Sequence, residues 1–249
     1  MKFTLNYLMI KRLGEMAGLE YNDISPMNEL APDTEALING LPAEALSETD
    51  RLLKELGMAD DARQPAEPIR AFVKALFTPE KCLRAELKEE SGSADVYFIP
   101  FDGAWLMMNA KHGELTVAGP VSYEIAKQYL VAAMHSALES GVLSAQYRDG
   151  KCNRSVTVTN AEEGYAFFGS LFDKTEAQER VYVHSFAKTE ENKQHIAKML
   201  TGEIGFELPE GEKGQPDKPS AKRVLRGIGI ALLVNICAAI LVAVLKAVL

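Results

Sequence analysis

The sequence predicts an α+β protein: an antiparallel sheet with flanking helices, followed by a C-terminal transmembrane helix. Short runs of β-branched and aromatic residues, separated by turn signals between Lys81 and Gly119, are typical of an antiparallel meander. Segments on both sides of it carry apolar residues at helical spacing. The run Gly227–Leu245 has no charged residue and is long enough to cross a bilayer as a helix.

The N-terminal region begins with a short strand, Lys2–Leu5, and a helix that ends at Gly18, a residue typical of helix C-termini. The apolar positions of this helix recur at helical spacing, at Leu5, Leu8, Met9, Leu13 and Met16. An irregular connection rich in Asn, Asp and Pro covers residues 20–42, with one short helix at 33–38. Two further helices are predicted, over 43–56 and 67–77.

The meander consists of the runs KCLRAELKEE, ADVYFIPF, AWLMMNAK and GELTVAG, which are separated by SGS, DG and KHG. Asp102-Gly103 is the strongest hairpin signal, because both residue types tolerate the positive φ angles of a tight two-residue turn. An amphipathic helix is predicted over Ser122–Glu139, with Ile125 and Tyr129 on its apolar face.

A looser echo of this order follows. SAQYRD, CNRSVTVTN and RVYVHSF are strand-like, and a helix with a Thr cap is predicted over Thr189–Leu200. NAEEGYAFFGSLFDKT is predicted to be helical, with Asn160 as its N-cap and Glu163 completing a capping box. The predicted domains are an α+β domain at 1–202, with halves 1–140 and 141–202, a flexible tether at 203–222 and a membrane anchor at 223–249.

The uncharged run at the C-terminus predicts a single membrane span, since nineteen helical residues extend roughly 28 Å. The predicted spanning residues include Gly227, Ile230, Leu233, Asn235, Ala239, Val242 and Leu245. Cations flank the run at Lys222, Arg223, Arg226 and Lys246, and their excess on the N-terminal side favours a cell-membrane protein with a cytoplasmic N-terminal domain. The alternative is a C-terminal helix buried in the protein's own core.

Composition and motifs argue against several functions. The 27 Lys and Arg against 35 Asp and Glu give a net charge of −8, which disfavours nucleic acid as a partner. The sequence has no metal-ligand spacing, no phosphate-binding glycine loop after a strand and no nucleophile motif. We therefore expect no metal, no cofactor and no catalytic residue, and we expect that the protein is not an enzyme.

One hairpin is a candidate surface for a protein partner. FIPFDGAWLMMNA gathers an apolar, adaptable set around a turn, comprising Phe101, Asp102, Trp105, Met107 and Met108. The alternative is that every second member faces the core of the protein, because strand side chains alternate.

The whole region from Phe3 to Gly202 resembles the EspG family of type VII (ESX) secretion-associated proteins. The resemblance is carried by FTLNYLMIKRLGEMAGL, by LLKELGMADDARQPAEPIRAFVKALFTPEKCLRAELKEE and by YFIPFDGAWLMMNAKHGELTVAGPVSYEIAKQYL. RSVTVTNAEEGYAFFGSLF and VYVHSFAKTEENKQHIAKML correspond to a second half. The resemblance implies quasi-twofold halves and a cytosolic chaperone that holds the helical tip of secreted substrates, and the membrane span departs from it.

These observations predict a membrane-tethered, non-catalytic protein-binding module. Its specific form would be a chaperone or accessory protein of type VII-like secretion, with small helical secreted proteins as partners. The alternatives are a structural scaffold or subunit of a membrane complex, and an enzyme whose site is dispersed over the sheet.

Overall fold

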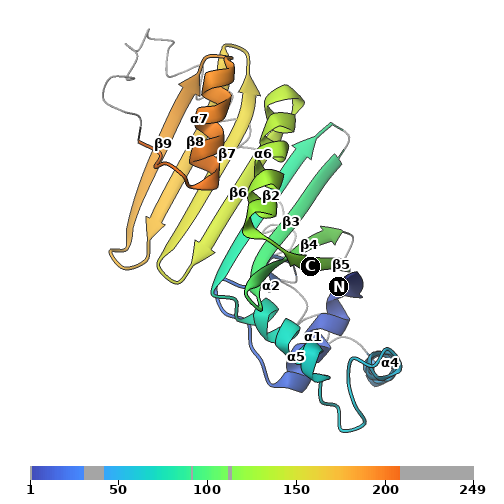
Figure 1. Cartoon of the computed structure of the whole chain (residues 1–249). Helices are drawn as coiled ribbons and strands as arrows, with labels where there is room; N and C mark the ends of the chain where they lie inside the picture. Colours follow the sequence, from blue (N-terminus) through green and yellow to red (C-terminus); the bar gives the residue numbers. More distant parts are fainter. Residues whose placement is uncertain (1, 31–41, 91, 112–113, 208–249) are drawn as a thin grey trace, which may run out of the picture. The chain divides into compact units, whose positions relative to one another are not determined.

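One antiparallel sheet dominates the computed structural model, which describes residues 2–30, 42–90, 92–111 and 114–207 (Figure 1). Its strand order is β1-β5-β4-β3-β2-β6-β7-β8-β9. The strands are β1 (Lys2–Asn6), β2 (Lys81–Glu89), β3 (Gly92–Phe101), β4 (Ala104–Lys111), β5 (Glu114–Val121), β6 (Val142–Asp149), β7 (Cys152–Ala161), β8 (Gly164–Asp173) and β9 (Gln178–Phe186). This confirms an α+β fold built on a large antiparallel sheet.

The described helices are α1 (Tyr7–Ala17), α2 (Met27–Leu30), α4 (Ala43–Glu55), α5 (Glu67–Phe77), α6 (Tyr123–Ser140) and α7 (Glu190–Thr201). Side chains cap three of them at the N-terminus. Asn6 accepts a hydrogen bond from the Met9 N–H, Ser122 accepts one from Ile125 and Thr189 accepts one from Asn192.

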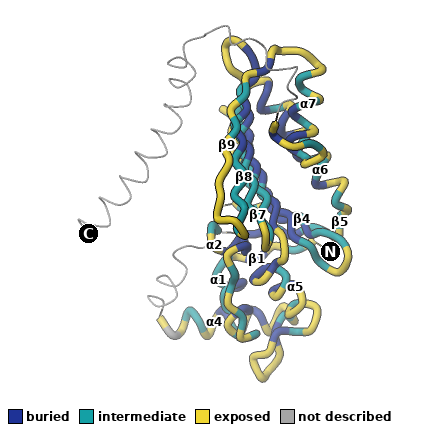
Figure 2. The backbone as a smooth tube through the Cα atoms, turned by 90° about the vertical axis from the view of Figure 1, so that its left-hand side faces the viewer, coloured by how far each residue is buried: buried dark blue, intermediate teal, exposed yellow. Residues whose placement is uncertain are grey.

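The helices lie on the two faces of the sheet. Figure 2 shows the sheet edge-on, with α6 and α7 on one side and α1, α4 and α5 on the other. The helix α6 packs on the central strands β2, β6 and β7, and α7 packs beside α6. On the other side, α5 packs on β3 and α1 packs between α5 and α4.

The order of elements repeats along the chain. Four strands and a helix, β2–β5 and α6, are followed by four strands and a helix, β6–β9 and α7. The first strands of the two sets, β2 and β6, pair antiparallel at the centre of the sheet. The looser echo expected from the sequence is therefore a repeated order of elements around the β2–β6 pair.

The larger core lies between α1, α5 and the β1–β5 part of the sheet. It includes Ile10 and Leu13 of α1, Phe72 and Phe77 of α5, and Leu106 and Met108 of β4. Gly14 lets α1 approach α5 closely, because a Cβ atom at this position would lie 2.2 Å from Cε1 of Phe77. Any larger residue at position 14 forces the Phe77 ring to move.

Several sequence predictions are confirmed within a residue or two. The helix predicted over 67–77 is α5, and the one predicted over 43–56 is α4. Gly18 ends α1 in the left-handed conformation. Asp102 and Gly103 form the β3–β4 turn with φ angles of +48° and +72°, as a two-residue hairpin turn requires.

The helix predicted at NAEEGYAFFGSLFDKT is wrong, because this segment contains the end of β7, a two-residue turn and β8. Asn160 and Ala161 pair with Tyr165 and Gly164 across the turn at Glu162-Glu163. The side chains of β8 alternate with the strand period, and Tyr165 and Phe167 are buried on the α7 side. Capping-box chemistry was present in the sequence, but the period-two burial of the aromatic residues outweighed it.

The predicted single-pass location in the cell membrane is contradicted. Among the residues that the structure describes, no helix is long and apolar enough to cross a bilayer. The longest described helix, α6, carries Glu124, Lys127 and Glu139. The residues predicted to span or flank the membrane, 222–249, lie outside the described residues. The prediction was based on the absence of charge from residues 227–245. Such a composition does not by itself establish a helix that spans a membrane.

The chain groups by its internal contacts into a unit Met1–Phe206 and a unit Glu207–Leu249. The boundaries predicted from the sequence, at 202 and 222, stay predictions, as do the two halves at 1–140 and 141–202.

The thiol of Cys82 on β2 is buried, and this predicts how fast it reacts with an alkylating reagent. Cys82 is fully buried, and burial raises its pKa to about 12, so the reactive thiolate is scarce at pH 8. We expect iodoacetamide at pH 8 to modify Cys152, which is half-buried, well before Cys82. Peptide mass spectrometry on native and urea-unfolded protein measures both rates, and equal labelling of the two thiols in the native protein would contradict the packing.

Candidate partner-binding surface

A patch on β7, β8 and β9 lies on the sheet face opposite α6 and α7. The pairing of these strands aligns the residues of the patch in rows across the sheet. In the middle row, Thr157 pairs with Phe168 and Phe168 pairs with Val183. Val158, Phe167 and Phe186 occupy alternate positions and are buried on the α6 and α7 side, so the residues of the patch point to the opposite side. We call the set the open face: Ser155, Thr157, Thr159, Ala166, Phe168, Ser170, Val181, Val183 and Ser185.

The open face is half-buried on β7 and β8 and exposed on β9, and its nine residues are uncharged. Val181 and Val183 are 54% and 53% exposed, and the Phe168 ring between them and Thr157 is half-buried. None of the nine residues is charged, although charged residues make up 25% of the chain. Depletion of charge around an aromatic centre is typical of the core of a protein interface. The surrounding serine, threonine and alanine side chains are small and let another element approach closely.

The same side of the sheet is covered in the first half of the repeat. Tyr97, Leu106 and Val117 of β3, β4 and β5 point to this side and are fully or almost fully buried in the core beneath α1 and α5. Among the described helices, none takes the corresponding place over β8 and β9 (Figure 2). Within the described residues, the open face is therefore the part of the sheet without the helical layer that its counterpart has.

A cluster of ion pairs marks the border between the covered and open regions. Glu29 of α2 forms an ion pair with Arg84 at 2.9 Å through one carboxylate oxygen and with Arg148 at 2.8 Å through the other. Arg84 also donates two hydrogen bonds to Asp95 of β3. These contacts fix α2 against β2 and β6 and close the edge of the covered core.

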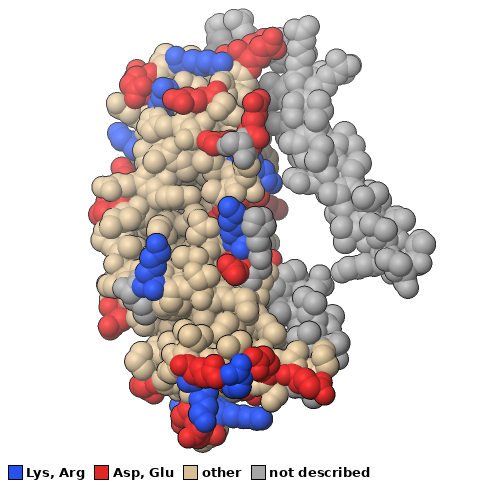
Figure 3. All heavy atoms as spheres, turned by 90° about the vertical axis from the view of Figure 1, so that its right-hand side faces the viewer, with Lys and Arg blue, Asp and Glu red and all other residues tan. Residues whose placement is uncertain are grey.

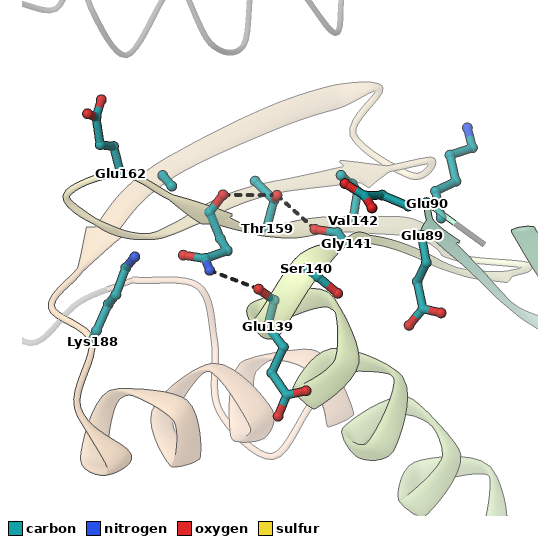
Figure 4. Close-up of a pocket in the computed structure, with 12 residues that line it drawn as sticks. Glu89, Glu90, Glu139, Ser140, Gly141, Val142, Thr159, Glu162 and Lys188 are labelled. Carbon is teal, nitrogen blue, oxygen red and sulfur yellow. Dashed lines mark hydrogen bonds between the residues drawn. The ribbon is translucent and has the colours of Figure 1, made fainter. Parts of the chain in front are cut away.

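A hollow with a volume of about 680 Å³ lies at the C-terminal end of α6 (Figure 4). The main-chain carbonyls of Glu139 and Gly141 there accept hydrogen bonds from Asn160 and Thr159. Figure 4 shows the carboxylate of Glu162 pointing away from those of Glu89 and Glu139, which stand apart from each other. No pair of them converges on a point where a substrate atom could be held.

Within the described residues, no three His, Cys, Asp or Glu side chains gather as a metal-binding group. On the face shown in Figure 3, Lys and Arg side chains stand singly or beside Asp and Glu. That face offers no continuous basic surface for phosphate groups.

In the hairpin predicted to bind a partner, most of the apolar side chains pack against the rest of the protein. Met108 is fully buried, Phe101 packs against the same core, and the Trp105 ring stacks on Tyr123 of α6 with centroids 4.9 Å apart. Met107 is half-buried on the α6 side, opposite Phe98, and Asp102 is exposed at the turn. The binding role of this hairpin stays a prediction.

The open face was not predicted from the sequence, although a signal for it was present. In CNRSVTVTN, hydroxyl residues at 155, 157 and 159 alternate with buried valines, and in RVYVHSF two valines flank Tyr182. The first pattern predicts a strand with one solvent-facing side. Which residues of the neighbouring strands share that side depends on how the strands pair, and the sequence of one strand does not contain this information.

The described part of the chain is thus an α+β protein with one large antiparallel sheet. No protein-family model matches the chain, and no curated protein matches its sequence. It is similar to a chain in the solved structure of the Mycobacterium tuberculosis type VII secretion system chaperone EspG5 in complex with a PE25-PPE41 dimer. The identity is 12%, the match covers 84% of this chain and 99% of that chain, and the TM-score is 0.48. The resemblance predicted from the sequence is confirmed as a weak likeness of fold.

Proposed function

We propose that the chain is a non-catalytic protein-binding module that holds an α-helical segment of another protein on the open face. The observation that supports this is the contrast between the two halves of one sheet. Its own helices cover the first half, whereas the uncharged surface around Phe168 and Val183 has no such cover among the described residues. A sheet buries its apolar face against a second layer, and a helix is the layer that this sheet already uses.

The expected partner follows from the chemistry of the open face. A helix that presents an apolar side chain to the Phe168 ring would bury Val181 and Val183 as well, since the three lie in adjacent register positions. Small or polar residues around that contact would meet the hydroxyl groups of Ser155, Thr157 and Ser170. We propose that the approximate twofold relation of the halves is the reason why a partner helix fits where α1 and α5 lie in the first half.

The finer form of this proposal is a chaperone or accessory protein of type VII-like secretion whose substrates are helical secreted proteins. The open face supports the binding role, and the secretion role depends on the identity of the partner that it captures.

Site-specific photo-crosslinking tests the binding role. With p-benzoylphenylalanine at position 183 of the full chain in its own cells, we expect one prominent cross-linked protein other than the chain itself, attached through a helical segment. The control places the same residue at Leu56, which is 58% exposed at the end of α4, at the other end of the sheet from β8 and β9 (Figure 1). Cross-links from position 183 only to residues 208–249 of the same chain, or no cross-links at all, would overturn the proposal.

A matched pair of variants measures the affinity for that partner once it is purified. Thr157→Lys places a charge in the centre of the open face and should weaken binding at least about tenfold, or roughly 1.4 kcal/mol. Thr4→Lys places the same charge on an exposed threonine of β1, at the opposite end of the sheet, and should leave binding unchanged. Equal affinities for the two variants would exclude the open face as the binding site.

A further inference from the structure

The two end strands of the sheet differ in how much backbone they leave open. β1 has five residues, whereas β9 has nine, and all nine pair with β8 on its inner side without a shift in register. Among the described residues, no strand pairs with the outer side of β9. A long end strand carries a row of unpaired amide and carbonyl groups, which readily accept another strand.

The repeat within the sheet shows what this position accepts. β5 and β9 are the fourth strands of their two sets. The outer side of β5 is covered by β1, which pairs with it antiparallel over five residue pairs. The equivalent side of β9 has no such strand among the described elements, so the architecture leaves room for one antiparallel strand there.

The sequence of β9 carries little protection against pairing. Natural end strands are commonly blocked by proline, by lysine, by a bulge or by being short. From Val181 to Phe186 the strand has no proline and no Lys, Arg, Asp or Glu. Val181 and Val183 are more than half exposed, and Glu179 and Arg180 stand together near its start.

We infer that β9 pairs with β9 of a second copy of this chain, antiparallel and centred on Tyr182. In this twofold register, Val181 of each copy lies opposite Val183 of the other. Arg180 then faces His184 of the other copy, and Glu179 faces Ser185. A pair centred on Arg180 would instead place two arginines directly opposite each other, which is unfavourable.

The choice of a second copy over a foreign strand rests on this self-complementarity. Of the symmetric registers, the one centred on Tyr182 pairs each exposed valine with a valine, so four valines form one apolar cluster across the junction. Such cross-strand pairs are the unit of sheet stabilisation. Because a single strand pair buries little area, the dimer is expected to be weak and dependent on concentration.

Variants that introduce charge at the two valines test the pairing in the full chain, by analytical ultracentrifugation over a range of concentrations. Val181→Lys with Val183→Lys places lysines opposite lysines and should raise the dimer dissociation constant at least tenfold. Val181→Glu with Val183→Glu should do the same. An equimolar mixture of the two double variants should recover dimer, because each lysine then faces a glutamate.

Cysteine pairing tests the register. In a Cys152→Ser, Cys237→Ser background, a mixture of the Val181→Cys and Val183→Cys proteins should form a disulfide-linked dimer under mild oxidation. Each single-cysteine protein alone should form much less, because residue 181 is diagonal to residue 181 of the second copy.

The control for the open face is Thr157→Lys, two strands inside the edge, which should leave the dimer intact. It therefore separates failure of the dimer from failure of partner binding. A chain that stays monomeric at all concentrations would overturn the inference. So would self-association that neither double variant weakens, or disulfides that form equally well in the single-cysteine proteins.

Discussion

We expect Phe77→Ala to lower the free energy of unfolding by about 3–5 kcal/mol. The ring is 1% exposed and lies at the meeting point of three segments. It fills the space that Gly14 leaves on α1 and packs edge-on against Tyr21 with ring centroids 5.7 Å apart. Its removal leaves a cavity that these neighbours cannot close, since the backbone is held on both sides. The N–H of Leu19 donates to the carbonyl of Gly14, and the N–H of Asn22, next to Tyr21, donates to the carbonyl of Phe77.

Urea unfolding followed by circular dichroism measures this loss. Leu56→Ala is the matched control, because Leu56 is also a large apolar residue near a helix end but is 58% exposed. The control should change stability by about 0.5 kcal/mol or less. A loss below about 1 kcal/mol for Phe77→Ala would show that α1 and α5 do not pack as described.

We expect Glu29→Ala to cost about 2 kcal/mol of stability. Glu29 is paired with two arginines, and the three side chains are between 15% and 26% exposed. Removing the acid from a fully buried pair costs about 3–5 kcal/mol, and an exposed pair contributes under about 1 kcal/mol, so this partly buried cluster lies between them. The variant removes the acidic partner of Arg148, whose Nε is already buried without a hydrogen-bond partner in the described residues. Arg84 is affected less, because it keeps its hydrogen bonds to Asp95.

The control for this variant is Glu48→Ala on α4. Glu48 also pairs with an arginine, Arg51, but both side chains are more than half exposed. Its loss should leave the free energy of unfolding almost unchanged, because solvent screens an exposed ion pair. Equal effects of the two variants in urea unfolding would mean that α2 is not held by its ion pairs.

The sequence alone predicted those parts of the fold that depend on neighbours along the chain. The Asp102-Gly103 turn, the Thr189 cap of α7 and Gly18 at the end of α1 are set by residues within one turn of each other. The helix α5 has the bounds that its apolar spacing and flanking prolines predict. Each of these features is a local choice with one strongly favoured conformation.

Features that depend on distant pairing were missed or misjudged. Residues 160–173 carried both a cap signal, at Asn160 and Glu163, and an aromatic strand pattern, and only pairing with β7 and β9 decides between them. The open face is defined by three strands in register, which the sequence of a single strand does not contain. The binding role of the hairpin around Asp102 stays a prediction, and most of its apolar side chains pack beneath α5 and α6. The membrane prediction came from residues 227–245 taken by themselves, and no described helix supports it.

The central β2–β6 pair has a consequence for how this protein is made. Leu83 of β2 pairs with Tyr147 of β6, so the ribosome must synthesise all of β3, β4, β5 and α6 before the two can meet. Until then, nascent β2 has an open side within an apolar sheet, and such an edge can join the wrong strand. The chain must therefore hold its first half together without a complete sheet for several seconds of translation, at about 5–20 residues per second.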